Sequence, residues 1–374
     1  MSFLFAIFLV LHGALHLMGA AKAFQIAAMP RLTQPISPSL GALWLLAAGL
    51  LFATAWALFA WPRWWWALGA GAVVSSQLAI ATSWHDAKYG SIANVVGLAG
   101  VVLGALSRGP TSFRAQYERD VEQGIGRAVA MPVLTEADLE PLPAAVQRYI
   151  RLTGAIGMPR VQSFRARFHG KIRSGRDARW VPFTGEQCNF YDQPSRFFLM
   201  NASMFGVPFQ AFHRFVGASA TMRVNVASLV PMVDAKGPAM NESETVTLFN
   251  DLCIFAPGAL VDRSIQWQEI DLYTVSASFT KGRHTIRATL VFNERGELKD
   301  FVSDDRLAAS KDGQSFAQMR WSTPLHNYRR FGPHLIMSEG EGVWHAPTGT
   351  YTYLHFDLDA IEYNLTAAPR PQRR

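Results

Sequence analysis

The sequence has only two cysteines, Cys188 and Cys253, and they stand far apart without a Cys-x-x-Cys spacing. This excludes a zinc site built from several cysteines and a scaffold held together by disulfides. The sequence also lacks nucleophile elbows, P-loops, dinucleotide-binding glycine loops and the His-Glu-x-x-His motif. We therefore expect no catalysis, no bound metal and no cofactor.

Charged residues are scarce in the first 107 positions, which hold five of the 63 in the chain. The net charge is +7, and no cluster of lysine and arginine coincides with a nucleic-acid-binding motif. We expect no nucleic-acid partner. The uneven distribution predicts two parts, one suited to lipid and one to water.

Four apolar runs fill the charge-poor part, and a helix needs about 20 residues to cross a bilayer. The runs are Met1–Ala21, Leu40–Trp61, Trp64–Trp84 and Tyr89–Leu106. They predict a four-helix transmembrane bundle over residues 1–107, with both of its ends on one side. Arg63, Arg108, Arg114 and Arg119 flank that side, against Lys22, Arg31 and Lys88 on the other. The positive-inside rule marginally favours a cytoplasmic location for the part that follows.

Polar residues within these runs are the informative ones, because their burial in lipid is costly. His12 and His16 are one helical turn apart, and His85 and Asp86 follow the third run. We predict a polar cluster of these four residues. It serves either as hydrogen bonding between helices or as a ligand site for metal or haem.

Residues 108–134 are a charged connector, and residues 135–374 form the expected water-facing domain. Beyond Met158 the hydrophobic period is two, as in antiparallel strands with one polar face. About ten strands are expected, enough for a sheet to curl strongly. The predicted fold is therefore α+β, a mainly antiparallel, half-barrel-like sheet with one or two helices packed on it.

One predicted strand carries basic residues on its polar face. They are Arg165, Arg167, Lys171 and Arg173. Such a stripe fits contact with anionic headgroups, or else an ordinary solvated face.

A helix is predicted at 242–256, because Asn241–Glu244 resembles a capping box and apolar residues then recur at helical spacing. Glu244 and Asp251 are seven apart and share one face, where Arg306 is an expected partner. The pair is either a structural salt bridge or a polar gate, and the helix either packs in a core or covers a cavity as a lid. The candidate ligand-binding residues are Glu244, Phe249, Asp251, Trp267, Asp305 and Arg306.

Several stretches resemble a bacterial membrane-protein family of unknown function. They are His12-Gly-Ala-Leu-His16, Leu32-Thr-Gln-Pro35, Trp84-His-Asp-Ala-Lys-Tyr-Gly90, Glu242-Ser-Glu-Thr-Val-Thr-Leu-Phe-Asn-Asp251, Ile265-Gln-Trp267, Asp304-Asp-Arg306 and Arg320-Trp-Ser-Thr-Pro324. The resemblance implies four spans followed by a β-rich domain in a bacterial inner membrane, and it implies no activity. More loosely, the β-rich part is similar to the half-barrels of periplasmic lipoprotein and lipid carriers in strand order and in its single helix.

These features favour a membrane-anchored module that binds a lipid, an acyl chain or another apolar small molecule, with membrane lipids as its partners. Two alternatives remain open. One is a redox-linked membrane protein that holds haem or quinone in its helices, and the other is an assembly or regulatory scaffold without a ligand.

Overall fold

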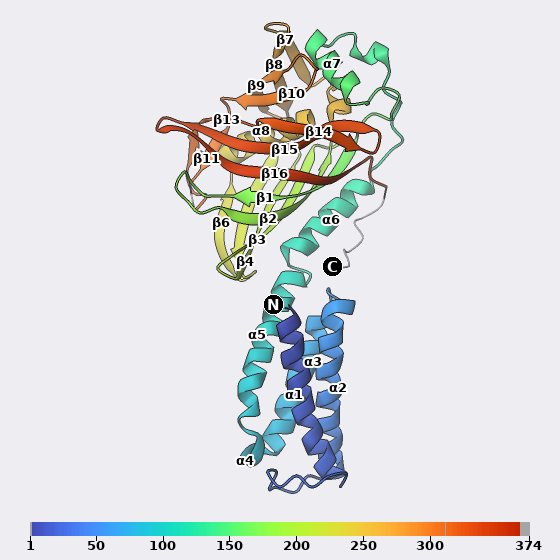
Figure 1. The fold of residues 1–374 in the computed structure, drawn as a ribbon, viewed down its shortest axis with the longest axis vertical. Helices are drawn as coiled ribbons and strands as arrows, with labels where there is room; N and C mark the ends of the chain where they lie inside the picture. The colour runs from blue at the N-terminus through green and yellow to red at the C-terminus, as the bar shows by residue number, and fades with distance from the viewer. Residues whose placement is uncertain (1, 311, 367–374) are drawn as a thin grey trace. The chain divides into compact units, whose positions relative to one another are not determined.

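The computed structural model describes residues 2–310 and 312–366 of the chain and divides it into two compact units, Met1–Ala115 and Gln116–Arg374. The first unit is helical and the second is built on a large antiparallel sheet (Figure 1). The predicted order of an apolar helical part followed by a β-rich part is confirmed.

The first unit contains α1 (Ser2–Ala23), α2 (Pro38–Ala60), α3 (Trp65–Thr82), the short α4 (Trp84–Ala87) and α5 (Gly90–Arg108). Three segments of the described chain are long and apolar enough to cross a membrane: Phe3–Ala23, Pro38–Ala60 and Gly90–Ile125. Helix α3 is not among them. It has 18 residues and includes the polar run Ser75-Ser76-Gln77, so the expected fourth span is not confirmed.

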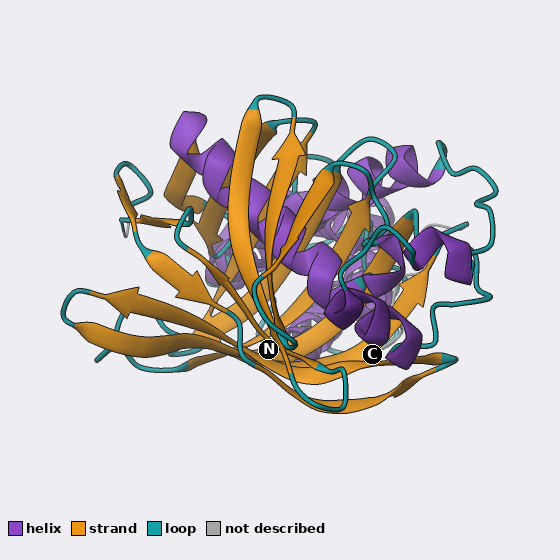
Figure 2. Cartoon of the chain, turned by 90° about the horizontal axis from the view of Figure 1, so that it is seen from above, coloured by secondary structure: helices purple, strands orange, loops and turns teal. Residues whose placement is uncertain are grey.

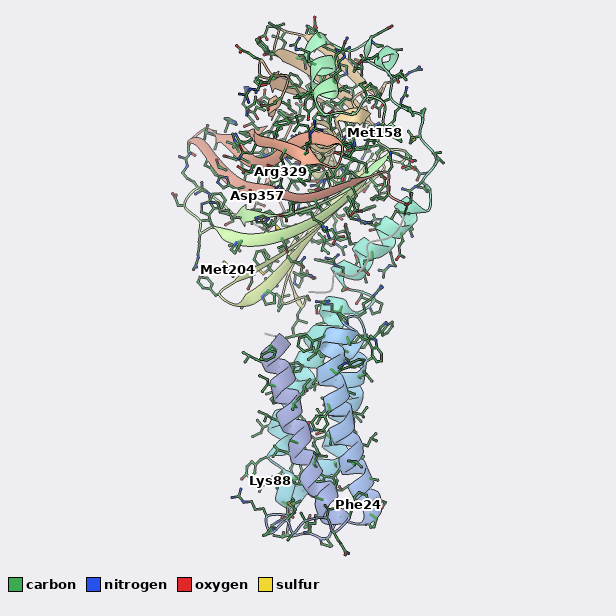
Figure 3. The ribbon with its side chains drawn as sticks, turned by 45° about the vertical axis from the view of Figure 1, so that its right-hand side comes forward. Phe24, Lys88, Met158, Met204, Arg329 and Asp357 are labelled. Carbon is green, nitrogen blue, oxygen red and sulfur yellow. The ribbon has the colours of Figure 1, made fainter. Side chains whose placement is uncertain are left out.

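Two links of this unit meet at one of its ends, where Phe24 and Lys88 are labelled in Figure 3. The carboxylate of Asp86 accepts hydrogen bonds from Thr33 Oγ1 at 2.7 Å and from the backbone N–H of Gln34 at 2.9 Å. These bonds join the α1–α2 link to α4.

The second unit starts within α6 (Phe113–Ile125) and continues with a 3₁₀ turn (Glu136–Leu139), α7 (Ala144–Leu152) and α8 (Pro238–Phe255). Its strands are β1 (Ser163–Ile172), β2 (Val181–Phe190), β3 (Ser195–Met204), β4 (Val207–Val216), β5 (Ser219–Val226), β6 (Val230–Lys236), β7 (Ile265–Glu269), β8 (Thr274–Lys281), β9 (His284–Phe292), β10 (Leu298–Ser303), β11 (Leu307–Ala309), β12 (Phe316–Gln318), β13 (Arg320–Ser322), β14 (Leu325–Phe331), β15 (His334–Ala346) and β16 (Gly349–Tyr363).

Fourteen strands form one sheet in the order β6-β5-β4-β3-β2-β1-β16-β15-β13-β10-β9-β8-β7, with β14 paired to β15. Most pairs are chain neighbours joined by hairpins, and the exceptions are β1 with β16, β13 with β15 and β10 with β13. The sheet curves strongly, and α8 lies across its concave side (Figure 2). Large twisted sheets curl in this way, and here the curl wraps both halves of the sheet around one helix.

The two faces of β2–β4 are covered by different helices. Gln187 and Asn189 point to α8, whereas Cys188, between them, contacts the α6 hydroxyl of Tyr117 at 3.2 Å. Gly124 brings α6 close to β2, because a Cβ there would lie 2.4 Å from the Phe190 ring. Helix α6 falls within the range expected to be a connector, and it packs on the convex face.

Helix α8 begins four residues before the predicted start. Gly237 adopts φ 98°, Pro238 follows at the first helical position, and a capping box at Asn241 is not used. The Asn241 side chain instead accepts a 2.7 Å hydrogen bond from the backbone N–H of Ala220 in β5. Nearly every α8 residue from Met240 to Phe255 is buried.

A substitution at Phe249 tests whether α8 belongs to the core. Its ring is fully buried, 4.7 Å from the Phe279 centroid and 5.6 Å from that of Phe301. We expect Phe249→Ala to lower the free energy of unfolding of a fragment containing residues 113–374 by about 3–5 kcal/mol, because burial is lost and a cavity remains. Chemical denaturation measures this, and a loss below about 1 kcal/mol would indicate a loosely seated lid.

Candidate ligand-binding site

A group of buried polar side chains surrounds Arg196 of β3, where the concave face meets α8. The guanidinium donates from Nε to Asp251 Oδ2 at 2.6 Å and from Nη1 to Glu244 Oε2 at 3.1 Å. Arg196 is 6% exposed, and both carboxylates are similarly buried. A buried charge needs a close, hydrogen-bonded partner, and each of these charges has one.

Further polar groups complete what we call the Arg196 cluster. Its members are Arg196, Glu244, Asp251, Gln187, Asn189, His213 and Arg306. Gln187 and Asn189 donate side-chain N–H groups to Asp251 at 2.7 and 3.2 Å. On the other side, Glu244 Oε1 lies 3.6 Å from His213 Nδ1 and 3.5 Å from Arg306 Nη1.

The two carboxyls of the cluster titrate differently. Burial acts to raise the pKa of Glu244, but the nearby Arg196 guanidinium, His213 and Arg306 outweigh burial, and its pKa is lowered. For Asp251, burial prevails over Arg196 and Asn189, and its pKa is raised. Glu244 therefore remains ionised at neutral pH, next to the two most exposed members of the cluster. The side chains of His213 and Arg306 are 19% and 12% exposed.

The structure brings together only part of the predicted site. Glu244 and Asp251 do share a face of the helix, and Glu244 meets Arg306. Their main partner is Arg196, which sequence reasoning missed. The available signal was a single arginine near the start of a strand, immediately before the apolar run Phe197 to Met200.

The other predicted ligand-binding residues lie elsewhere. Phe249 is enclosed in the core, and the Trp267 ring packs 6.4 Å from it. Asp305 accepts a 2.6 Å hydrogen bond from the backbone N–H of Arg287, so it fastens the loop after β10 to β9. Asp305 takes no part in the Arg196 cluster.

Apolar side chains on the concave face become exposed with distance from α8. Along β3, Met200 is 7% exposed and Met204 is 45% exposed, and along β4 the values are 2% at Ala211 and 46% at Val207. Half-buried apolar residues lie between these ends and beside the Arg196 cluster. We call them the apolar strip: Phe198, Ala202, Phe209, Met222, Val224 and Val233.

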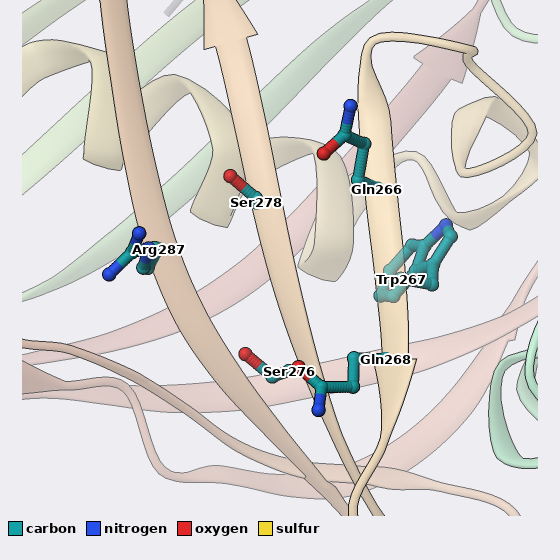
Figure 4. A pocket seen from close by; sticks show the side chains of 6 residues that line it. All are labelled: Gln266, Trp267, Gln268, Ser276, Ser278 and Arg287. Carbon is teal, nitrogen blue, oxygen red and sulfur yellow. The ribbon is translucent and has the colours of Figure 1, made fainter.

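A separate groove of about 450 Å³ lies over β7, β8 and β9 (Figure 4). It is lined by Gln266, Trp267, Gln268, Ser276, Ser278 and Arg287. Ser276 and Ser278 alternate with the buried Val275 and Ala277, so these serines face away from the core. Apart from Trp267 the lining consists of amides, hydroxyls and one guanidinium, which does not suit a wholly apolar ligand.

The four polar residues predicted to cluster in the membrane part separate into two groups. His12 Nε2 lies 3.0 Å from Asn94 Oδ1, and His16 Nε2 lies 2.7 Å from Ser76 Oγ. His85 and Asp86 instead pair with each other at 3.2 Å in α4. The expectation of one cluster is wrong, because His16 lies about 10 Å before the end of α1 at 1.5 Å per residue.

The basic strand is only partly available for contact with lipid headgroups. Arg165 is 8% exposed and lies 3.3 Å from Glu362, so the prediction is wrong for this residue. Lys171 and Arg173 pack over the Trp180 ring at 5.2 and 4.5 Å, and Arg167 is half-buried. For these three residues, membrane contact stays a prediction.

Within residues 2–310 and 312–366, no group of three or more His, Cys, Asp or Glu side chains is placed to hold a metal ion.

Replacing Arg196 tests whether the cluster is held together by charge. Arg196→Leu leaves two carboxylates buried without their cation, so we expect a loss of about 3–5 kcal/mol in unfolding free energy at pH 7.5. The loss should shrink towards pH 5, because unpaired buried carboxyls have raised pKa values and become protonated. Denaturation of the 113–374 fragment measures both effects. The control is Arg167→Leu, a half-buried arginine on the opposite face, and equal losses in the two variants would contradict the account.

Comparison with known proteins places the sheet domain in a family. No curated protein matches the chain. A putative outer membrane lipoprotein-sorting protein domain from Vibrio parahaemolyticus is similar at 10% identity and TM-score 0.31, covering 54% of this chain and 85% of that one. A DUF1329 family protein from Desulfovibrio piger ATCC 29098 is similar at 8% identity and TM-score 0.28, covering 60% and 94%. Likenesses of this extent do not identify a function.

The family described as "Family of unknown function (DUF6544)" matches residues 132–356, more than half of the chain. The matched range runs from the 3₁₀ turn to β16 and includes every member of the Arg196 cluster. The chain therefore belongs to this family of unknown function.

Proposed function

We propose that the second unit is a membrane-anchored binding module for an amphiphile with an acyl-like chain. The apolar strip takes the chain, and His213 and Arg306 of the Arg196 cluster meet its polar end. The observation that carries this proposal is the rise in exposure of concave-face apolar residues from Met200 to Met204 and from Ala211 to Val207. Binding sites combine an apolar lining with a few placed polar groups.

The polar end of the strip supports the choice of an amphiphile over a wholly apolar ligand. His213 Nδ1 is buried and makes no hydrogen bond, although Glu244 lies 3.6 Å from it. His213 is also on the strand pair that carries the strip, since it pairs with Phe198 and Met222. A ligand hydroxyl or carboxyl at this point would meet both an imidazole and the Arg306 guanidinium.

Removing one apolar contact tests the proposal. In the full chain, Val224→Gln should weaken binding of a fluorescent fatty acid about fivefold, because the surface of this half-buried valine that the ligand would cover contributes about 1 kcal/mol and 1.4 kcal/mol is a factor of ten. Titration of the probe in detergent gives the two dissociation constants. The matched control is Asn225→Ala, the next residue on the opposite face, which should leave binding unchanged.

The probe also partitions into the detergent around the helices, so the difference between variants is the informative quantity. Mass spectrometry of the purified chain should in addition detect lipid, in smaller amount for Val224→Gln. Equal binding by both variants, with no lipid carried through purification, would favour the scaffold alternative.

We further propose that α3 completes a bundle of four spans in a bacterial inner membrane, with the second unit on the cytoplasmic side. Helix α3 contributes Ser76 to the bonds with His12 and His16, so it packs among the apolar helices. Polar groups bonded to neighbouring helices are tolerated in a membrane-spanning segment.

Reporter fusions test the number of spans. With four spans, fusions after residue 30 and after residue 120 report opposite sides, because three crossings separate them. With α3 outside the membrane, two crossings separate them and both fusions report the same side. We expect alkaline phosphatase activity at residue 30 and fluorescent-protein signal at residue 120, and the same reporter succeeding at both positions would contradict four spans.

A further inference from the structure

Two neighbouring hairpins end in exposed apolar residues. Strands β3–β6 pair consecutively and antiparallel, so the β3–β4 and β5–β6 turns lie at the same end of the sheet. We call their exposed apolar residues the hairpin-tip patch: Met204, Phe205, Val207, Leu229, Val230 and Met232, each 45–81% exposed. Figure 3 labels Met204 at this end. Exposed apolar residues gathered at one end of a sheet are the pattern of an interaction site.

The backbone of the β3–β4 turn is strained. Phe205 and Gly206 both have positive φ, 54° and 80°, in a two-residue hairpin turn. Asparagine, aspartate or glycine normally takes the position of Phe205 in such a turn, and a bulky residue there is strained. The turn thus holds the most exposed aromatic ring of the patch, 81% exposed, at a position where it does not help the fold.

Cations border the patch. The β1–β2 connection reaches the same end of the sheet, since Ile172 pairs with Val181 at that end of the two strands. Residues 171–180 contain Lys171, Arg173, Arg176 and Arg179 against the single acid Asp177. Arg179 lies over the Phe205 ring at 5.2 Å, so charge and exposed aromatic surface are adjacent.

We propose that the hairpin-tip patch docks on an anionic lipid bilayer, with its apolar side chains among the headgroups and the arginines of the β1–β2 connection on the lipid phosphates. Charge complementarity supports this partner, because cations beside apolar side chains are the pattern of interfacial membrane binding. Connectivity supports it as well. Helix α5 lies in a candidate span, and only residues 109–112 separate it from α6.

Docking of the hairpin-tip patch would affect access to the apolar strip, but the docking proposal does not depend on the proposed function. Met204 and Val207 belong to the patch and also to the concave face that leads to the apolar strip. A docked patch would therefore open the strip towards the acyl chains of the bilayer. The membrane contact itself requires no bound ligand.

The test uses the full chain in nanodiscs. Cys188 and Cys253 are both buried, so a new surface cysteine takes a fluorophore selectively. Phe205→Cys carrying an NBD label should show blue-shifted emission and strong quenching by spin-labelled lipid in discs with about 30% anionic lipid. Leu272→Cys is the matched control. It is 62% exposed at the opposite end of the strands and should keep a water-like spectrum.

A charge reversal separates lipid docking from other contacts. Arg179→Glu in the Phe205→Cys background should reduce lipid quenching at least threefold, because it removes an exposed cation next to the label. Water-like emission at position 205 would overturn the proposal. So would equal quenching in purely zwitterionic discs, or a shielded label that lipid spins do not quench, since the last result indicates a second copy of the chain or another protein. If the acyl probe does not bind but the label at position 205 is still quenched, the ligand proposal is refuted and the docking proposal stands.

Discussion

Two carboxylates on one buried helix require a buried cation, and this requirement determines how α8 sits in the sheet. Glu244 and Asp251 are two turns apart, and Arg196 reaches both from β3. Either carboxylate alone would be costly to bury, and Arg196 without them would be equally costly. The three side chains therefore set the rotation of α8 about its axis and its position along β3. The Phe249 stack then anchors the opposite side of the helix to β8 and β10.

The placement of α8 decides what remains uncovered. Helix α6 covers the convex face of β2–β4 through Tyr117 and Gly124, and α8 covers one end of the concave face. The other end of that face keeps apolar side chains that no helix of the described chain buries, from the apolar strip to the hairpin-tip patch. An apolar path thus begins beside His213 and Arg306, the most exposed members of the Arg196 cluster, and ends at the cation-bordered turns.

The order of the two units could be predicted from the sequence. So could the strands that have one polar face, such as β1, β5, β8 and β9. It did not indicate β2–β4 clearly, because a helix lies on each face and residues such as Phe197 and Leu199 are buried on the convex side. Helical periodicity correctly placed Glu244 and Asp251 on one face. Their partner could not be found by local spacing, since Arg196 is 48 and 55 residues away in the chain. The prediction that His85 lies near His12 failed for a different reason. His85 is in the link after α3, and a position in a link does not show how far along a neighbouring helix its partner lies.

Photocrosslinking of a diazirine fatty acid to the full chain, followed by peptide mapping, tests the central claim most directly. The account predicts crosslinks concentrated in residues 196–236, at the apolar strip, and their loss in Val224→Gln but not in Asn225→Ala. Crosslinks confined to the apolar helices of the first unit, with none in residues 196–236, would contradict a ligand on the concave face of the sheet.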